Sequence, residues 1–269
     1  MIDARSLVGT HDVMMITFDT LRYDVAARAM NAGLTPNLAS VLPGGQWELR
    51  HTPGSFTYAA HHAFFAGFLP TSARPGRHPR LFAAAFSGSE TTCHKTAVFD
   101  APTWVAGLAA AGYHTVCIGG VGFFNKQTPL GSVLPDIFAE SHWSADLGVT
   151  SRDSTERQVS IAERILAARS VGKRLMLFIN VSALHQPNCI FTPGATVDSP
   201  ETMQAALAYV DSCLGRLFNT VRSHAPTLVI LCSDHGTAYG ADGFVGHRLA
   251  HRAVWDVPYA EFVLEPYKR

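Results

Sequence analysis

Three apolar segments of this sequence are each followed by side chains that bind metal ions well. The segments and the residues that follow them are Val13–Phe18 with Asp19, Arg174–Val181 with His185, and Leu228–Cys232 with Asp234 and His235. Two carboxylates and an imidazole form an oxygen-rich ligand set that suits a divalent ion and leaves coordination positions open. Such an ion polarises a phosphoryl or sulfuryl oxygen and lowers the pKa of a hydroxyl group bound to it.

A site of this kind requires a fold that brings the three segments together. Each segment is short and apolar, as buried strands of a parallel sheet are. The carboxyl ends of parallel strands lie at one edge of the sheet, so residues that are distant in sequence meet there. Asp234 and His235 are neighbours, and a bend after Ser233 is needed to turn both toward one point. The alternative is that this pair marks an ordinary exit from a strand into a loop.

Helical patterns alternate with strand patterns along the whole chain. Further strands are predicted at 46–51, 115–118 and 261–264, and helices at 57–68, 103–111, 154–170 and 200–224, with another that begins at Pro36 after Thr35 as its cap. This alternation is typical of α/β proteins, in which helices cover both faces of the sheet. The sequence therefore predicts a three-layer αβα sandwich with a mostly parallel central sheet, and residues 1–269 are expected to form a single domain.

Two segments, 71–100 and 121–150, show no regular pattern and are broken by glycine and proline. Segments of this length without secondary structure of their own are uncommon, and many of them are functional. We expect 71–100 to be a long excursion that passes over the site. Either segment is a candidate for selecting the substrate.

The composition disfavours several classes of partner. The 21 basic and 21 acidic residues give a formal net charge of zero, so we expect no nucleic-acid partner. No apolar run approaches the roughly eighteen residues that a membrane helix needs, and the N-terminus has no signal-peptide pattern. The five cysteines form no CxxC pair, which indicates reduced thiols. We therefore expect a cytoplasmic protein without a membrane partner, and the oligomeric state is left open.

Five motifs resemble, in the same order, the signatures of the alkaline phosphatase/sulfatase superfamily. They are Phe18–Asp24, Thr35–Leu38, Ser55–Pro70, Ala183–Pro187, and Ser233–Gly236 with Gly246 and His247 downstream. One such motif alone is a weak match, but five in the family's order across most of the chain are specific. The resemblance implies an alkaline-phosphatase-like fold and a compact metal-dependent hydrolase that acts on ester bonds.

The resemblance also implies roles for individual residues. The ligands of a catalytic divalent ion (Mn, Zn, Mg or Ca) correspond to Asp19, Asp234 and His235. Thr57 lies ten residues before Gly67, the family spacing, and therefore matches the nucleophile, which also binds the metal ion. A helix start at Thr57 would favour an anionic substrate through its free N–H groups. Ser55 is the alternative nucleophile.

Histidines supply the remaining implied roles. His185 and His247 resemble residues that hold the substrate anion, assist the leaving group or bind a second metal ion. His61 follows Thr57 by one helical turn, so it shares a helix face with Thr57 and is expected to contact the substrate. His251 lies four residues after His247 and is a weaker candidate that depends on a helix there. Structural alternatives remain, because a threonine at a helix start is commonly an N-cap and a histidine near proline is commonly a loop residue.

The nucleophile segment departs from the pattern of true sulfatases. Those enzymes convert a cysteine or serine to formylglycine within a Cys/Ser-x-Pro/Ala-x-Arg motif, whereas this chain has Thr57 followed by residues 58–61 without arginine. Threonine cannot give the same aldehyde, so a sulfatase is disfavoured. Transferase relatives carry membrane anchors that have no counterpart here. No Asp-x-x-x-His pair lies near His185, so we expect one metal ion and leave a second open. We also expect the C-terminal subdomain of larger relatives to be missing.

The sequence thus predicts a metal-dependent hydrolase of phosphate mono- or diesters. Thr57 would attack phosphorus in a small anionic ester, and water would then release the product. The alternatives are phosphonate-ester hydrolysis and transfer of the phosphoryl group to another acceptor. A hypothesis of a different class is a non-catalytic relative that binds an anion or a partner protein. The joint presence of the metal ligands and the nucleophile argues against that hypothesis.

Overall fold

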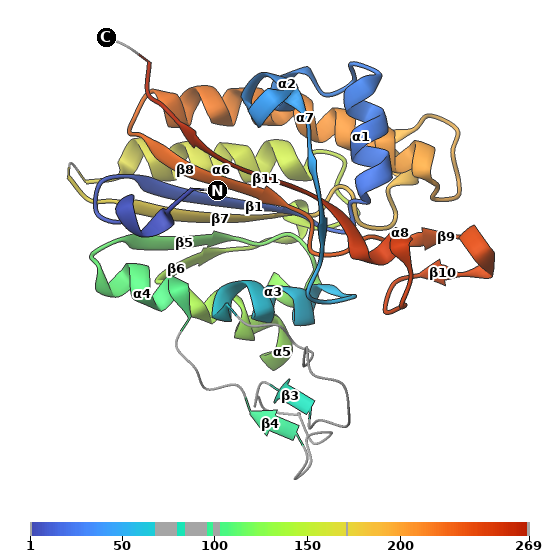
Figure 1. The fold of residues 1–269 in the computed structure, drawn as a ribbon, viewed down its shortest axis with the longest axis horizontal. Helices are drawn as coiled ribbons and strands as arrows, with labels where there is room; N and C mark the ends of the chain where they lie inside the picture. The colour runs from blue at the N-terminus through green and yellow to red at the C-terminus, as the bar shows by residue number, and fades with distance from the viewer. Residues whose placement is uncertain (1, 68–79, 84–95, 99–102, 171, 268–269) are drawn as a thin grey trace.

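The structure is a computed structural model that describes residues 2–67, 80–83, 96–98, 103–170 and 172–267. A seven-stranded sheet in the order β2-β11-β8-β1-β7-β5-β6 forms its centre (Figure 1). The strands are β1 (Asp12–Phe18), β2 (Glu48–His51), β5 (His114–Ile118), β6 (Glu140–His142), β7 (Leu175–Val181), β8 (Thr227–Cys232) and β11 (Asp256–Leu264). Neighbouring strands pair in parallel, except that β11 is antiparallel to both β8 and β2.

Helices cover both faces of this sheet (Figure 1). One layer contains α1 (Tyr23–Asn31), α2 (Pro36–Val41), α6 (Ser154–Ala168) and α7 (Pro200–Arg222), and the other contains α3 (Thr57–Ala66) and α4 (Trp104–Ala110). Side chains of β1 alternate between the layers: Met14 and Ile16 join the first core, and Val13 and Met15 join the second. The predicted three-layer αβα sandwich with a mostly parallel sheet is therefore confirmed.

The start of α2 is held by a residue from another helix. The carboxylate of Asp211, which is buried in α7, accepts hydrogen bonds from the backbone N–H groups of Asn37 (3.1 Å) and Leu38 (2.7 Å). Thr35 occupies the N-cap position but makes no capping hydrogen bond with its side chain. The predicted positions of Thr35 as N-cap and Pro36 as first helical residue are confirmed, but the acceptor for the free N–H groups is the buried Asp211 carboxylate and not the Thr35 hydroxyl.

The last strand is longer than the sequence predicts. β11 spans nine residues and lies between β2 and β8, whereas the apolar pattern predicts only 261–264. Pro258 within the strand explains the difference, because a proline lowers the strand signal of the run that contains it. The carbonyl oxygen of Pro258 nevertheless accepts a hydrogen bond from the N–H of Ser233 at 3.2 Å.

The two irregular segments differ in how much the structure describes. Residues 121–150 form short pieces: η3 (Gly122–Phe124), α5 (Pro129–Val133), η4 (Pro135–Ile137), β6 and η5 (Ala145–Leu147). Of 71–100, only β3 (Arg80–Ala83) and β4 (Thr96–Val98) are described, and they pair in parallel. The expected passage of that segment over the site lies outside the described residues.

A small ribbon and a short helix follow β8. Strands β9 (Ala238–Tyr239) and β10 (Val245–Gly246) pair antiparallel, and α8 (Arg252–Trp255) leads directly into β11. Within the described ranges, no helix has both the length and the apolar character needed to cross a membrane.

Candidate active site

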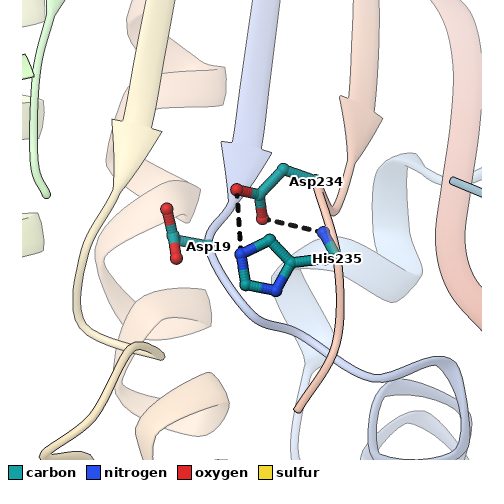
Figure 2. A group of neighbouring side chains, drawn as sticks. All are labelled: Asp19, Asp234 and His235. Carbon is teal, nitrogen blue, oxygen red and sulfur yellow. Dashed lines mark hydrogen bonds and ion pairs between the residues drawn. The ribbon is translucent and has the colours of Figure 1, made fainter. Parts of the chain in front are cut away.

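Two aspartates and one histidine meet at the carboxyl edge of the sheet (Figure 2). Asp19 follows β1, and Asp234 and His235 follow the neighbouring strand β8. All three side chains are fully buried, and one ligand atom from each lies within 4.8 Å of the other two. Adjacent parallel strands thus bring residues from opposite ends of the chain to one point.

A bend after Ser233 turns both members of the adjacent pair toward this point. Asp234 Oδ1 accepts a hydrogen bond from the backbone N–H of His235 at 2.9 Å. Gly236 follows, and a Cβ atom there would lie 2.0 Å from the carbonyl oxygen of Ala253 in α8. Only glycine permits this close approach, so the bend depends on Gly236.

The backbone just after β1 also has an unusual conformation. Thr20 has a φ of 65°, a left-handed conformation that is strained for a β-branched residue. Its hydroxyl donates to the carbonyl oxygen of Leu184 at 3.0 Å, and its N–H donates to Asp234 Oδ1 at 3.2 Å. These two bonds tie the turn after Asp19 to the segments that follow β7 and β8.

The free ligand atoms have the character of a metal site. Asp19 Oδ1 and Asp234 Oδ2 are buried without a hydrogen-bond partner in the described part of the chain. His235 Nδ1 donates to the carbonyl oxygen of Gly236 at 2.8 Å, which leaves a lone pair on Nε2, 3.6 Å from Asp234 Oδ2. Buried oxygens without donors are unfavourable, and a cation among these three atoms would satisfy them.

The electrostatics agree with this interpretation. Burial, reinforced by the charge of Asp234, raises the pKa of Asp19 from 3.8 to about 7. Burial likewise raises the pKa of Asp234 from 3.8 to about 6. Burial lowers the pKa of His235, which favours the neutral imidazole that binds metal ions. A divalent cation would restore both carboxylates to the ionised form.

Thr57 places its hydroxyl against the same cluster. Its Oγ1 atom lies 3.4 Å from Asp19 Oδ2 and 3.3 Å from His235 Nε2. Thr57 is the first residue of α3, whereas the N-cap is Phe56, so the alternative that Thr57 is an N-cap is wrong. No side chain caps this helix, which leaves backbone N–H groups and the positive end of the helix dipole beside the hydroxyl. Ser55 lies before the helix, and its carbonyl oxygen accepts from the N–H of Arg248 at 2.9 Å.

A cleft of about 270 Å³ opens at Thr57. It is lined by Thr57, His185 and His247 and by residues of the irregular segment, namely Val121, Gly122, Phe123, Thr128, Leu130, Gly131 and Val149. The ring of His247 lies 4.7 Å from that of His235 and 6.5 Å from that of His185, measured between centroids. Burial, together with the neighbouring His235, lowers the pKa of His247 to about 4, so this imidazole is neutral at pH 7.

Comparison with known proteins decides the family. The family model described as Sulfatase matches residues 13–260, which is nearly the whole chain. The match includes Asp19, Asp234 and His235, the candidate metal-binding residues that are called the metal cluster below. The chain belongs to the sulfatase family. Curated proteins, by contrast, provide no match to the sequence.

Several solved structures share the fold of this sulfatase-family chain. The zinc complex of the C-terminal periplasmic domain of EcEptC from Escherichia coli has a TM-score of 0.66 and 11% identity, over 96% of this chain and 74% of that one. Lipoteichoic acid synthase LtaP from Listeria monocytogenes has a TM-score of 0.63 and 12% identity, over 98% and 67%. An alkaline phosphatase superfamily protein from Vibrio parahaemolyticus has a TM-score of 0.59 and 17% identity, over 96% and 62%. These identities show a shared fold. The cytoplasmic location stays a prediction.

His61 occupies a different place from the one the sequence predicts for it in this sulfatase-family chain. Its side chain is completely buried, with Nδ1 2.7 Å from the carbonyl oxygen of Thr57 and Nε2 3.0 Å from Thr17 Oγ1. Both ring nitrogens are thus used inside the protein, and burial lowers the pKa of His61 to about 3. The expected substrate contact is wrong, because the shared helix face of Thr57 and His61 is turned toward the sheet. His61 thus links the first turn of α3 to β1.

His251 also lies away from the cluster. It is the N-cap of α8, where its Nδ1 accepts from the N–H of Ala253 at 3.1 Å, and its Nε2 pairs with Asp242 Oδ2 at 3.0 Å. His251, the weaker candidate for a site residue, therefore caps a helix and does not belong to the site. His185 and His247, by contrast, both face the cleft.

The sequence reasoning missed two residues of the site. Asn180 donates from Nδ2 to Asp19 Oδ2 at 3.3 Å, and its Oδ1 accepts from the N–H of Val121 at 3.0 Å. It therefore links the metal cluster to the cleft wall. The available signal was an amide inside the otherwise apolar β7. Thr52 donates from its hydroxyl to the carbonyl oxygen of Asp234, and nothing in its local sequence indicated that contact.

Proposed function

We propose that this chain is a metal-dependent hydrolase of phosphate esters in which Thr57 is the nucleophile. The observation that carries the proposal is the position of the Thr57 hydroxyl, within 3.4 Å of Asp19 and 3.3 Å of His235. A hydroxyl so close to two metal-binding side chains, at an uncapped helix start, suits attack on an anionic ester. Family membership and the superfamily fold support an enzyme that acts on ester bonds.

Asp19, Asp234 and His235 would hold one divalent ion, and the Thr57 hydroxyl would complete the set. Two carboxylates, one neutral imidazole and one hydroxyl are ligands that Mn, Zn, Mg and Ca accept to different degrees, so the donor set alone leaves the metal open. When bound, such an ion acts as a Lewis acid that lowers the pKa of the hydroxyl and neutralises charge on phosphorus oxygens. A second ion would need His185 or His247 as ligands. Among the described residues, neither histidine belongs to a group of three metal-binding side chains, and the one such group is Asp19, Asp234 and His235.

The protein's own groups account for the remaining steps. Thr57 Oγ1 forms a bond to phosphorus and loses its proton to solvent, while the bond from phosphorus to the leaving oxygen breaks. The uncapped N-terminus of α3 offers N–H groups to the phosphoryl oxygens. His185 is the group that gives a proton to the departing oxygen, and the neutral imidazole of His247 holds the substrate anion through a hydrogen bond. Water then attacks the phospho-threonine, which regenerates Thr57 and releases the product.

Three alternative activities differ from this proposal in the nucleophile, the substrate or the acceptor of the phosphoryl group. A formylglycine sulfatase is disfavoured because position 57 is threonine. Phosphonate-ester hydrolysis would use the same centre. Phosphoryl transfer to another acceptor has support in the names of two structural neighbours, a phosphoethanolamine transferase from Campylobacter jejuni and the synthase LtaP. A non-catalytic relative that binds an anion or partner remains the hypothesis of a different class.

Metal content and ester turnover test the proposal together. Elemental analysis is made on wild type and on Asp234→Ala, alongside turnover of p-nitrophenyl phosphate, bis-p-nitrophenyl phosphate and p-nitrophenyl sulfate. We expect about one metal ion per chain, lost in the variant, and turnover of a phosphate ester that Thr57→Ala abolishes. Turnover of the sulfate ester alone would contradict the assignment of the nucleophile. Neither metal nor turnover with Mn, Zn, Mg or Ca would favour the binding protein.

A further inference from the structure

We infer that the substrate carries an uncharged, largely apolar group on phosphorus and a single negative charge, as a phosphodiester or a phosphonate monoester does. The inference rests on the proposed function and narrows its substrate class. Dianionic phosphate monoesters would be the poorer substrates.

The part of the cleft wall that comes from the 121–150 segment is apolar. Val121, Phe123, Leu130 and Val149 line it, and all come from the irregular 121–150 segment. The one polar side chain in this wall is Thr128, and its hydroxyl is used to cap α5 by accepting from the N–H of Gly131 at 3.0 Å. A substrate group against this wall therefore meets hydrocarbon and aromatic surface, which favours an apolar group.

Phe123 connects this wall to the nucleophile. Its ring lies 5.5 Å from the ring of Tyr58, at an interplanar angle of 33°, and Tyr58 directly follows Thr57. Thr57 and Phe123 line the same cleft, so Phe123 offers an aromatic surface to a group attached to phosphorus at Thr57. The wall is also tied to the metal cluster, because Asn180 bonds both Val121 and Asp19.

None of the ten residues that line the described cleft is a lysine or an arginine. Two cations outside the lining are Arg248, which keeps its positive charge, and Lys126, which is held by a hydrogen bond. The guanidinium of Arg248 lies 5.1 Å over the ring of Phe56, and the ammonium of Lys126 donates to Ser141 Oγ at 2.7 Å. The described cleft thus lacks the second strong positive charge that a dianionic ester needs.

The charges of the centre lead to the same substrate class. Asp19 and Asp234, once ionised, balance a divalent ion, so the metal cluster itself is close to neutral. The N–H of Arg248 donates to the carbonyl oxygen of Ser55 at 2.9 Å, and its guanidinium lies over Phe56, the N-cap of α3, which places one positive charge near the helix start at Thr57. One net positive charge suits a monoanion, because a second negative charge would have to be desolvated without a partner.

The test compares three p-nitrophenyl substrates: p-nitrophenyl phosphate, bis-p-nitrophenyl phosphate and p-nitrophenyl phenylphosphonate. With the metal ion that binds, kcat/KM for one of the two monoanions should exceed that for the monoester. Phe123→Ala should lower kcat/KM for the preferred monoanion by about tenfold or more, because an aromatic contact is lost, and should lower the monoester value less. A monoester preference, or an equal loss for all three, would overturn the inference.

A charged wall gives the converse test. Leu130→Lys should move the ratio of kcat/KM toward the monoester by about tenfold, since it supplies the missing positive charge. Val197→Lys adds the same charge at an apolar position that is 74% exposed and outside the cleft, and it should leave the ratio unchanged. An unchanged ratio in Leu130→Lys would contradict the inference. No turnover of any of the three phosphorus esters would overturn the proposed function and this inference with it, whereas turnover with monoester preference overturns the inference alone.

Discussion

The metal cluster and the wall of the cleft are joined through Thr57 and Asn180, yet they are built in opposite ways. Asp19, Asp234 and His235 are completely buried at the ends of two central strands. The wall comes from short helical pieces between Val121 and Val149, in which exposed and buried residues alternate irregularly. The cluster is therefore positioned by the sheet itself, and the wall by local turns.

This difference separates the chemistry of the site from its selectivity. Side chains on strand ends are held by backbone pairing, so their positions tolerate little change. Loops on a rigid scaffold change more freely and carry much of the functional variation of a fold. We therefore expect substitutions in the cluster to affect every substrate, and substitutions in the wall to affect substrates unequally.

The largest effect is expected for Asp234→Asn. Loss of one ionised ligand should remove the metal ion and lower kcat by about a thousandfold or more for all esters. Asp211→Asn is the matched control, since Asp211 is also a buried aspartate but caps α2. The control should lower the melting temperature, through a loss of about 1 kcal/mol of capping, and keep the metal ion. Metal retained by Asp234→Asn would contradict the ligand assignment.

A smaller effect is expected for the histidines of the cleft. His185→Ala should lower kcat by about a hundredfold, the usual contribution of proton transfer, and the loss should be greatest for esters with poor leaving groups, because these need protonation most. His247→Ala should lower kcat by about a hundredfold for all esters, because a hydrogen-bond donor to the substrate anion is lost. His251→Ala is the control, and its kcat should stay within about twofold of wild type, since His251 caps α8 outside the cleft. Equal losses in all three variants would rule out a specific role for the cleft histidines.

Asn180→Ala should sharpen the comparison, because Asn180 is the residue that contacts both regions. We expect metal affinity or kcat to fall by about tenfold to a hundredfold, as for other residues that orient a metal ligand. Equilibrium dialysis against the metal ion measures metal affinity, and turnover at saturating metal ion measures kcat separately. Substrate preference should change as well, because Val121 of the wall loses its hydrogen-bond acceptor. A drop in kcat with unchanged preference would show that the two regions are independent.

The smallest effect is a pH dependence of stability. The raised pKa values, about 7 for Asp19 and about 6 for Asp234 against 3.8 in the unfolded chain, mean that the folded metal-free protein binds more protons than the unfolded one. The metal-free protein should therefore lose stability as pH rises from about 4 to 7. The bound ion removes this loss, so the melting-temperature difference between metal-loaded and chelated protein should grow over that range and level off above it. A constant difference would contradict the buried, metal-binding carboxylates.

The sequence predicted the cluster better than the wall for a physical reason. Val13–Phe18 and Leu228–Cys232 are apolar runs whose ends must lie at one edge of a parallel sheet, so Asp19, Asp234 and His235 could be placed together before any coordinates. Thr57 was predicted from its spacing to Gly67, which resembles that of the family, but its contact with Asp19 could be seen only in the structure. The wall has no periodic pattern, so nothing in the sequence indicated that Phe123 and Leu130 would line one cleft.

Errors arose where a long-range contact decided a local feature. Thr35 is the N-cap of α2 as predicted, but the carboxylate that accepts from the N–H groups of this helix comes from α7, which the local sequence around Thr35 could not reveal. His61 has the helical spacing of a substrate contact, but α3 packs against the sheet and turns that face inward. Asn180 was hidden inside an apolar strand. In each case the decisive partner is more than forty residues away in sequence.

The central claim is that Thr57 is the nucleophile at the metal cluster, and trapping the covalent adduct tests it most directly. Metal-loaded wild type is mixed with its best p-nitrophenyl ester, quenched in acid during turnover, digested and mapped by mass spectrometry. The proposed function predicts a phosphorus adduct on the peptide that contains Thr57, also formed in Thr57→Ser, and absent from Thr57→Ala and Asp234→Asn. An adduct on another residue, or full turnover by Thr57→Ala, would contradict it.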